Sequence, residues 1–170
     1  TTWGWYGLLS GRLGRYQDAQ AQLMRGRELE PASMIARVWQ AQILYHQRRF
    51  AEAESVASET MEMDSTFMLA WTWKANALLQ RGEAARAVSL LERQVALLPP
   101  GRVEETHGLL AYAYALAGRD REARETIATI RVMSGGRLPA IGAVAAALEE
   151  LDDHEAAVTL LGQAIARHDT

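Results

Sequence analysis

One alanine position recurs along the whole chain at a nearly constant spacing. Its members are separated by 34, 34, 36 and 34 residues: Ala19, Ala53, Ala87, Ala123 and Ala157. Each follows a turn-like cluster such as Gly14-Arg15 or Gly82-Glu83, and each lies between two helical patterns. A fixed period in the mid-thirties with two helices per period is typical of stacked helix pairs. The spacing therefore predicts an all-α fold, an α-solenoid.

The hydrophobic periodicity places two helices in every period. The first helices are predicted at about 2–13, 32–47, 66–80, 103–117 and 138–150, and the second at about 16–30, 50–62, 84–97, 120–132 and 154–168. Pro31 and Pro99-Pro100 end second helices, since proline cannot continue a helix. Ser65 is expected to cap the following helix, and Asp152 or Asp153 the last one. No strand pattern is apparent.

The same period predicts a single domain over residues 1–170. Its repeats are expected at about 1–33, 34–67, 68–102, 103–136 and 137–170. Because the chain begins at Thr1, we interpret it as a fragment of a longer protein whose targeting information lies elsewhere.

Composition argues against several classes of partner. The net charge is −3, so the chain offers no broad basic field for nucleic acid. No apolar run approaches the roughly 20 residues that a membrane helix needs. Cysteine is absent, which rules out thiolate metal sites and favours a cytoplasmic location.

The pattern resembles the tetratricopeptide repeat over nearly the whole chain. The third repeat matches best, with Trp71, Ala75, Leu78, Gly82, Ala87, Leu91 and Pro99 at the motif's large, small and proline positions. The first repeat matches with Trp3, Gly7, Ala19, Leu23 and Pro31, and the other three match in part. Sel1-like and pentatricopeptide repeats fit the period and signature residues less well. The resemblance implies a right-handed superhelix of antiparallel helix pairs.

Two tryptophans in AWTWKA must face different ways. Residues two apart on a helix point about 200° away from each other, so Trp71 and Trp73 cannot share one face. Trp71, Ala75 and Leu78 form the face that carries the motif. Trp73 lies on the opposite face, which lines the concave groove in the tetratricopeptide family.

The position of Trp73 can be followed through the other repeats. Trp5 and Trp39 occupy it in the first two repeats, whereas Leu109 and Ala143 occupy it in the last two. We call Trp5, Trp39 and Trp73 the tryptophan series. Together with neighbouring positions, the predicted groove residues are Trp5, Leu8, Arg12, Trp39, Gln42, Tyr45, His46, Leu69, Trp73, Asn76, Gln80 and Tyr112.

Two interpretations of the tryptophan series stay open. The aromatic rings can pack on neighbouring first helices and stabilise the inner wall, or they can recognise a peptide or partner segment. Repeats four and five lack the series, which argues against a purely structural need. The family's basic clamp for C-terminal carboxylates is not expected, because no basic pair flanks Asn76 and Lys74 lies on the other face.

The leading function is therefore a protein-interaction scaffold that binds a protein or peptide in the groove. The alternative is a homo-oligomerisation or regulatory arm of a larger bacterial signalling protein, since ALEELDDHEAAVTLL and IARHDT resemble the C-terminal repeats of some bacterial regulators. A homodimer would then form through the terminal helix, where Leu160, Leu161 and Ile165 are expected to be only partly covered.

Catalysis is not expected, and neither is a cofactor or a metal. Glu104 and His107 could face one way, and His154 lies in an acidic cluster, but each is better explained as a helix boundary than as a metal site. The sequence contains no phosphate-binding loop and no nucleophile motif.

Overall fold

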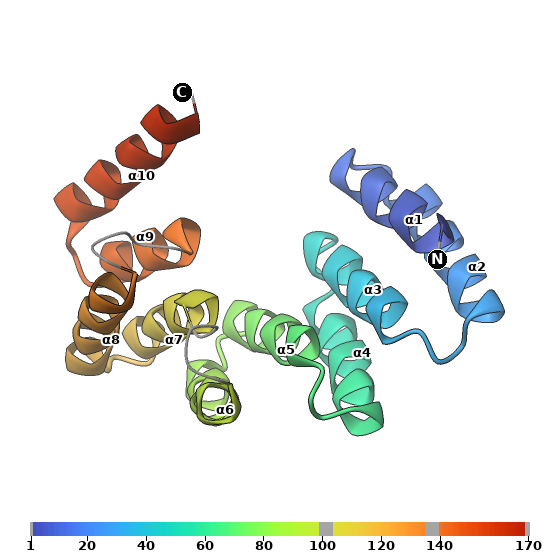
Figure 1. The fold of residues 1–170 in the computed structure, drawn as a ribbon, viewed down its shortest axis with the longest axis horizontal. Helices are drawn as coiled ribbons and strands as arrows, with labels where there is room; N and C mark the ends of the chain where they lie inside the picture. The colour runs from blue at the N-terminus through green and yellow to red at the C-terminus, as the bar shows by residue number, and fades with distance from the viewer. Residues whose placement is uncertain (1, 99–103, 135–139, 169–170) are drawn as a thin grey trace. The chain divides into compact units, whose positions relative to one another are not determined.

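The computed structural model describes residues 2–98, 104–134 and 140–168. Within them the chain forms helices and turns and no strand (Figure 1). The helices are α1 Thr2–Arg12, α2 Tyr16–Leu29, α3 Met34–His46, α4 Phe50–Met63, α5 Met68–Gln80, α6 Ala84–Leu97, α7 Glu104–Leu116, α8 Asp120–Met133, α9 Ile141–Glu150 and α10 His154–His168. The predicted all-α fold of helix pairs is confirmed. Predicted and observed bounds agree within two residues, apart from the start of α9, where the prediction falls on residues outside the described part.

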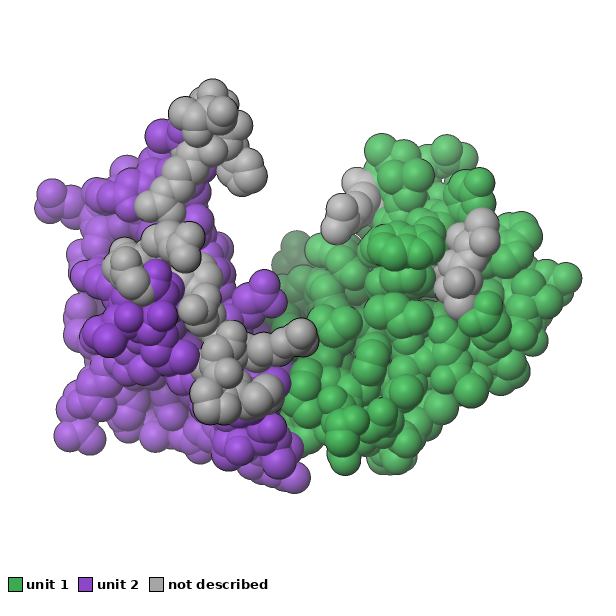
Figure 2. All heavy atoms as spheres, viewed as in Figure 1, with its two compact units in different colours: residues 1–82 green, residues 83–170 purple. Residues whose placement is uncertain are grey.

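The contacts between residues divide the chain into two compact units, residues 1–82 and 83–170 (Figure 2). In unit 1, α1 packs on α2 and α3, α3 packs on α2 and α4, and α5 packs on α3 and α4. In unit 2, α7 packs on α6, α8 and α9, and α9 packs on α10. The single domain expected from the period stays a prediction.

Small residues allow the paired helices to approach closely. All five alanines of the recurring position are completely buried: Ala19, Ala53, Ala87, Ala123 and Ala157. Gly7 shows how tight the contact between α1 and α2 is, because a Cβ added there would lie 2.6 Å from Leu23 Cγ. Larger side chains, such as Leu23 and Leu91, fill the remaining space and are buried as well.

The turn inside each helix pair contains one residue in the left-handed conformation. These residues recur with the period of the repeat: Gly14, Arg48, Gly82, Gly118 and Asp152, with φ between 57° and 75°. At Arg48 the next N–H, that of Arg49, donates to the Leu44 carbonyl at 2.9 Å, which closes the helix end in the Schellman manner. Glycine suits this position because it has no Cβ to clash with the backbone.

Of the helix caps predicted before α10 and α5, the first is confirmed and the second is wrong. Asp153 accepts a hydrogen bond from the Ala156 N–H at 3.4 Å, as a cap of α10 should. The prediction for Ser65 is wrong: the residue before α5 is Phe67, which makes no capping bond. Asp64 instead holds this turn, accepting from the N–H and the hydroxyl of Thr66 at 2.8 and 2.6 Å.

The two tryptophans of α5 lie in different environments, as their spacing predicts. Trp71 is only 2% exposed, and its Nε1 donates to the Ser65 carbonyl at 2.9 Å. Trp73 is half-buried. Truncating Trp71 therefore removes core packing, whereas truncating Trp73 removes part of a surface.

We expect Trp71→Ala to lower the free energy of unfolding by about 3–5 kcal/mol, the cost of removing a buried large aromatic side chain. Trp73→Ala should cost clearly less. Urea denaturation followed by circular dichroism measures both. Equal losses in the two variants would contradict the assignment of the two faces.

The left-handed turn residue gives a second prediction: substitutions at two of these positions should change the free energy of unfolding in opposite directions. Arg48→Gly should raise the free energy of unfolding by roughly 0.5–1 kcal/mol, because glycine adopts positive φ without steric cost. Gly82→Ala should lower it by about 1 kcal/mol for the converse reason. The same denaturation experiment tests both, and shifts of the same sign would show that this conformation does not control the turn.

Candidate binding surface on the first helices

The predicted groove residues lie on four first helices. Helix α1 carries Trp5, Leu8 and Arg12, α3 carries Trp39, Gln42, Tyr45 and His46, α5 carries Leu69, Trp73, Asn76 and Gln80, and α7 carries Tyr112. The first three of these helices belong to unit 1, and α7 belongs to unit 2. The side chain of Arg12 lies outside the described part of the structure.

Trp39 is a packing residue. It is 8% exposed and lies in a core cluster with Leu23 and Ile43, against which Leu8 also packs. Trp5 covers it from the solvent side: the two ring centroids are 5.0 Å apart, and Trp5 itself is 65% exposed. The two tryptophans are thus in contact, but they contribute differently. Trp39 is needed to build the core, and Trp5 offers its ring to solvent.

Tyr45 is the centre of a second aromatic cluster. Its ring centroid lies 5.6 Å from that of Trp73, 5.6 Å from that of His46 and 5.5 Å from that of Phe50, in edge-to-face geometry each time. His46 and Trp73 also meet, with centroids 6.1 Å apart. Tyr45 and Trp73 are half-buried and His46 is exposed. The rings are therefore partly packed against the protein and partly accessible to solvent.

Phe50 is the member of this cluster that the groove prediction missed. It begins α4, a second helix, and therefore lies outside the first-helix positions from which the groove was predicted. In the structure it supports Tyr45 from the second helix of the same pair.

Other predicted groove residues on α3 and α5 have polar side chains. The amide of Asn76 donates to the Thr72 carbonyl at 3.0 Å, which uses one of its two N–H groups. Gln42 is half-buried, and Leu69 and Gln80 are exposed. This face therefore offers apolar rings beside amide donors and acceptors.

In unit 2, the predicted residue Tyr112 on α7 is half-buried. Burial raises the pKa of its hydroxyl group, and the nearby Glu150 raises it further, so the phenol stays neutral. Tyr114, two residues on, has a different role. Its hydroxyl donates to Glu92 at 2.8 Å, and burial followed by this bond raises its pKa to about 12. Tyr114 thus ties α7 to α6.

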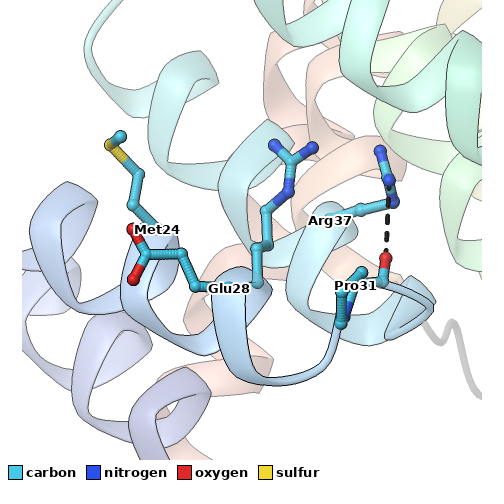
Figure 3. A pocket seen from close by; sticks show the side chains of 5 residues that line it. Met24, Glu28, Pro31 and Arg37 are labelled. Carbon is cyan, nitrogen blue, oxygen red and sulfur yellow. Dashed lines mark hydrogen bonds between the residues drawn. The ribbon is translucent and has the colours of Figure 1, made fainter.

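A separate hollow lies between α2 and α3. It encloses about 290 Å³ and is lined by Met24, Arg27, Glu28, Pro31 and Arg37 (Figure 3). Arg37 donates to the Pro31 carbonyl at 3.5 Å and lies 3.7 Å from Glu59. Burial, and then the charge of Arg37, lower the pKa of Arg27. None of the predicted groove residues lines this hollow. The repeat pattern did not predict its two arginines.

The described residues contain no group of three histidine, aspartate or glutamate side chains placed to hold a metal ion. His154 instead contacts Glu149, with its Nδ1 2.8 Å from Oε2. No helix in the described ranges is long and apolar enough to cross a bilayer.

These features define an all-α repeat protein built from stacked helix pairs. The family model of the tetratricopeptide repeat matches residues 7–65. Solved structures extend the likeness in fold over nearly the whole chain, which is an α-solenoid of the tetratricopeptide type.

Three solved structures illustrate the likeness. The nearly identical TPR-like repeats of a putative kinesin light chain from Podosopora anserina share 18% identity, with a TM-score of 0.74, covering 97% of this chain and 92% of that one. MamA from Desulfovibrio magneticus RS-1 shares 17%, with a TM-score of 0.67 and coverages of 94% and 89%. YrrB, described as a TPR protein with an unusual peptide-binding site, shares 17%, with a TM-score of 0.60 and coverages of 94% and 81%. No curated protein matches the chain.

Proposed function

We propose that this protein is a non-catalytic interaction scaffold that binds a peptide or partner segment on its first helices, along the predicted groove. One observation carries the proposal: Tyr45, His46 and Trp73 form an accessible ring cluster on α3 and α5. Repeats four and five have Leu109 and Ala143 at the position of Trp73, so stacking of repeats does not itself demand an aromatic ring there. YrrB, a protein of similar fold, is described as having a peptide-binding site, which supports peptide binding as the function.

The chemistry of this face favours a ligand with aromatic or aliphatic side chains. Ring faces and edges of Tyr45 and Trp73 can cover an apolar side chain, and Trp and Tyr commonly dominate binding energies. The amides of Gln42 and Asn76 can pair with the backbone of an extended peptide. Lys74 is the sole lysine of the chain, so a ligand that depends on a lysine cluster is a poor match.

Peptide binding tests the proposal. Peptides selected on the wild-type protein should bind Trp73→Ala and Tyr45→Ala at least tenfold more weakly, a loss of about 1.4 kcal/mol in binding free energy. Isothermal titration calorimetry gives the affinities, and circular dichroism verifies that the variants are folded. Trp39 is unsuitable for this test, because it is buried and its truncation would damage the core.

Trp3→Ala is the matched control. Trp3 is also a partly exposed tryptophan, but it occupies the motif position of Trp71 rather than the groove position. Its truncation should leave peptide affinity unchanged. Wild-type affinity in folded Trp73→Ala and Tyr45→Ala variants would rule out this face as the binding surface.

A second candidate function is self-association through the terminal helix, as an assembly arm of a larger protein. The observation in its favour is the exposure of Leu161 and Ile165 on α10, whereas Leu160 on the same helix is buried. Exposed apolar residues that recur along one helix face commonly mark an interaction surface.

A further inference from the structure

Arg37, which lines the hollow between α2 and α3, stands where the third repeat has a buried tryptophan. It precedes Trp71 by one period and so occupies the motif's large position in the second repeat. Trp71 Nε1 donates to the Ser65 carbonyl at 2.9 Å. Arg37 donates to the equivalent carbonyl, that of Pro31, at 3.5 Å. The arginine is therefore placed as the tryptophan is, with a charged group instead of an indole ring.

Arg27 brings a second charge to the same hollow. Its position holds Met61 in the second repeat, so α4 and α5 carry Met61 and Trp71 where α2 and α3 carry two arginines. The junction of α4 and α5 forms with apolar side chains at both positions. Stacking one repeat on the next therefore does not itself require arginine there.

The charge of the two guanidinium groups is only partly compensated. Arg27 Nη1 donates to the side-chain oxygen of Gln40, which is neutral. Arg37 has a side chain that is 16% exposed, and its Nη1 lies 3.7 Å from the Glu59 carboxylate, beyond hydrogen-bonding distance. Its Nε is buried without a hydrogen-bond partner among the described residues. Burial lowers the pKa of Arg27, and the charge of Arg37 lowers it further.

The charges around the hollow match a ligand with a single negative charge. Glu28 lines the hollow but is already paired, with its Oε2 2.7 Å from Arg25 Nη1, and its side chain points away from Arg37 (Figure 3). The lining side chains and their ion-pair partners comprise three arginines and two glutamates, an excess of one positive charge. A dianion would be repelled by Glu28 and Glu59, whereas a monoanion neutralises the excess.

We propose that this hollow binds a carboxylate group between Arg27 and Arg37. The planar fork of a guanidinium group fits a carboxylate, and the Nη groups of Arg37 have only long contacts at present. Met24 and Pro31 are exposed and can cover a short apolar chain attached to the carboxylate. The volume of about 290 Å³ lies at the lower end for ligand pockets and suits a small acid or a single side chain. The site is separate from the predicted groove, none of whose residues lines it.

Titration with sodium butyrate at constant ionic strength tests the site, with the amide chemical shifts of the protein as the readout. Butyrate should bind with a dissociation constant on the order of 1 mM and shift the signals of residues 24–37 first. Butyramide has the same shape without the charge and should not bind. Inorganic phosphate, as the dianion, should bind roughly tenfold more weakly than butyrate because it faces the two glutamates.

Arg27→Met and Arg37→Met place an apolar side chain at the two positions. Each should weaken butyrate binding about tenfold or more. The midpoint of urea denaturation should stay the same or rise, because a buried and partly unpaired charge contributes little to stability. Arg49→Met is the matched control: it removes the same charge from an exposed pair with Glu52 and should leave butyrate affinity unchanged.

Two peptides identify the source of the carboxylate. One contains a single internal glutamate and has both ends blocked, and the other has a free C-terminal carboxylate and no acidic side chain. Tighter binding of the first than of butyrate indicates an acidic partner segment, and tighter binding of the second indicates a chain end. Weaker binding of both indicates a free small acid.

Three results would overturn the inference: butyramide binding as well as butyrate, phosphate binding more tightly, or unchanged butyrate affinity in both methionine variants. Lower urea midpoints in both variants, with no butyrate binding to the wild type, would show that the arginines serve stability alone. Trp73→Ala and Tyr45→Ala should bind butyrate as the wild type does. The groove proposal and this one therefore succeed or fail separately.

Discussion

The close approach of two paired helices at a single small residue, as in α1 with α2 and α3 with α4, is the contact on which the rest of the structure depends. The alanine of this position is completely buried in all five repeats. A small side chain allows two helix backbones to approach, and the larger residues beside it then interlock. The period of this contact sets the period of everything else, including the left-handed turn residue and the positions by which repeats stack.

On α5 the two sides of a first helix have different roles. Trp71 packs in the core, whereas Trp73 is half-buried and meets the ring of the exposed His46. The candidate binding surface therefore lies on the side of α5 opposite to the core contact of Trp71.

The repetition made much of this predictable from sequence. Helix bounds and the opposite faces of Trp71 and Trp73 follow from period and helix geometry alone. The burial of Trp39 could not be predicted in this way, because it depends on which side chains surround the residue. It has the same position as Trp5 and Trp73, yet Leu8, Leu23 and Ile43 enclose it. Repeat equivalence specifies the direction of a side chain but not the shape of the space around it.

Features that belong to single repeats gave no repeating signal. The contact of Tyr45 with Phe50 joins the two helices of the second pair, and the hollow beside Arg27 and Arg37 occurs where α2 meets α3. The turn at Asp64 likewise depends on a local bond to Thr66 rather than on the motif. These details depend on individual side chains, and the three-dimensional structure was needed to find them.

The most direct test of the central claim enlarges the small residue and compares it with an exposed neighbour on the same helix. Ala53 is completely buried on α4, which packs on α3, and Ala51, two residues earlier, is exposed. Ala53→Val should lower the free energy of unfolding by about 1–3 kcal/mol through overpacking. Ala51→Val should cost no more than its helix propensity, below about 0.7 kcal/mol. Equal losses in urea denaturation would contradict the claim that close helix approach at this alanine holds the repeats together.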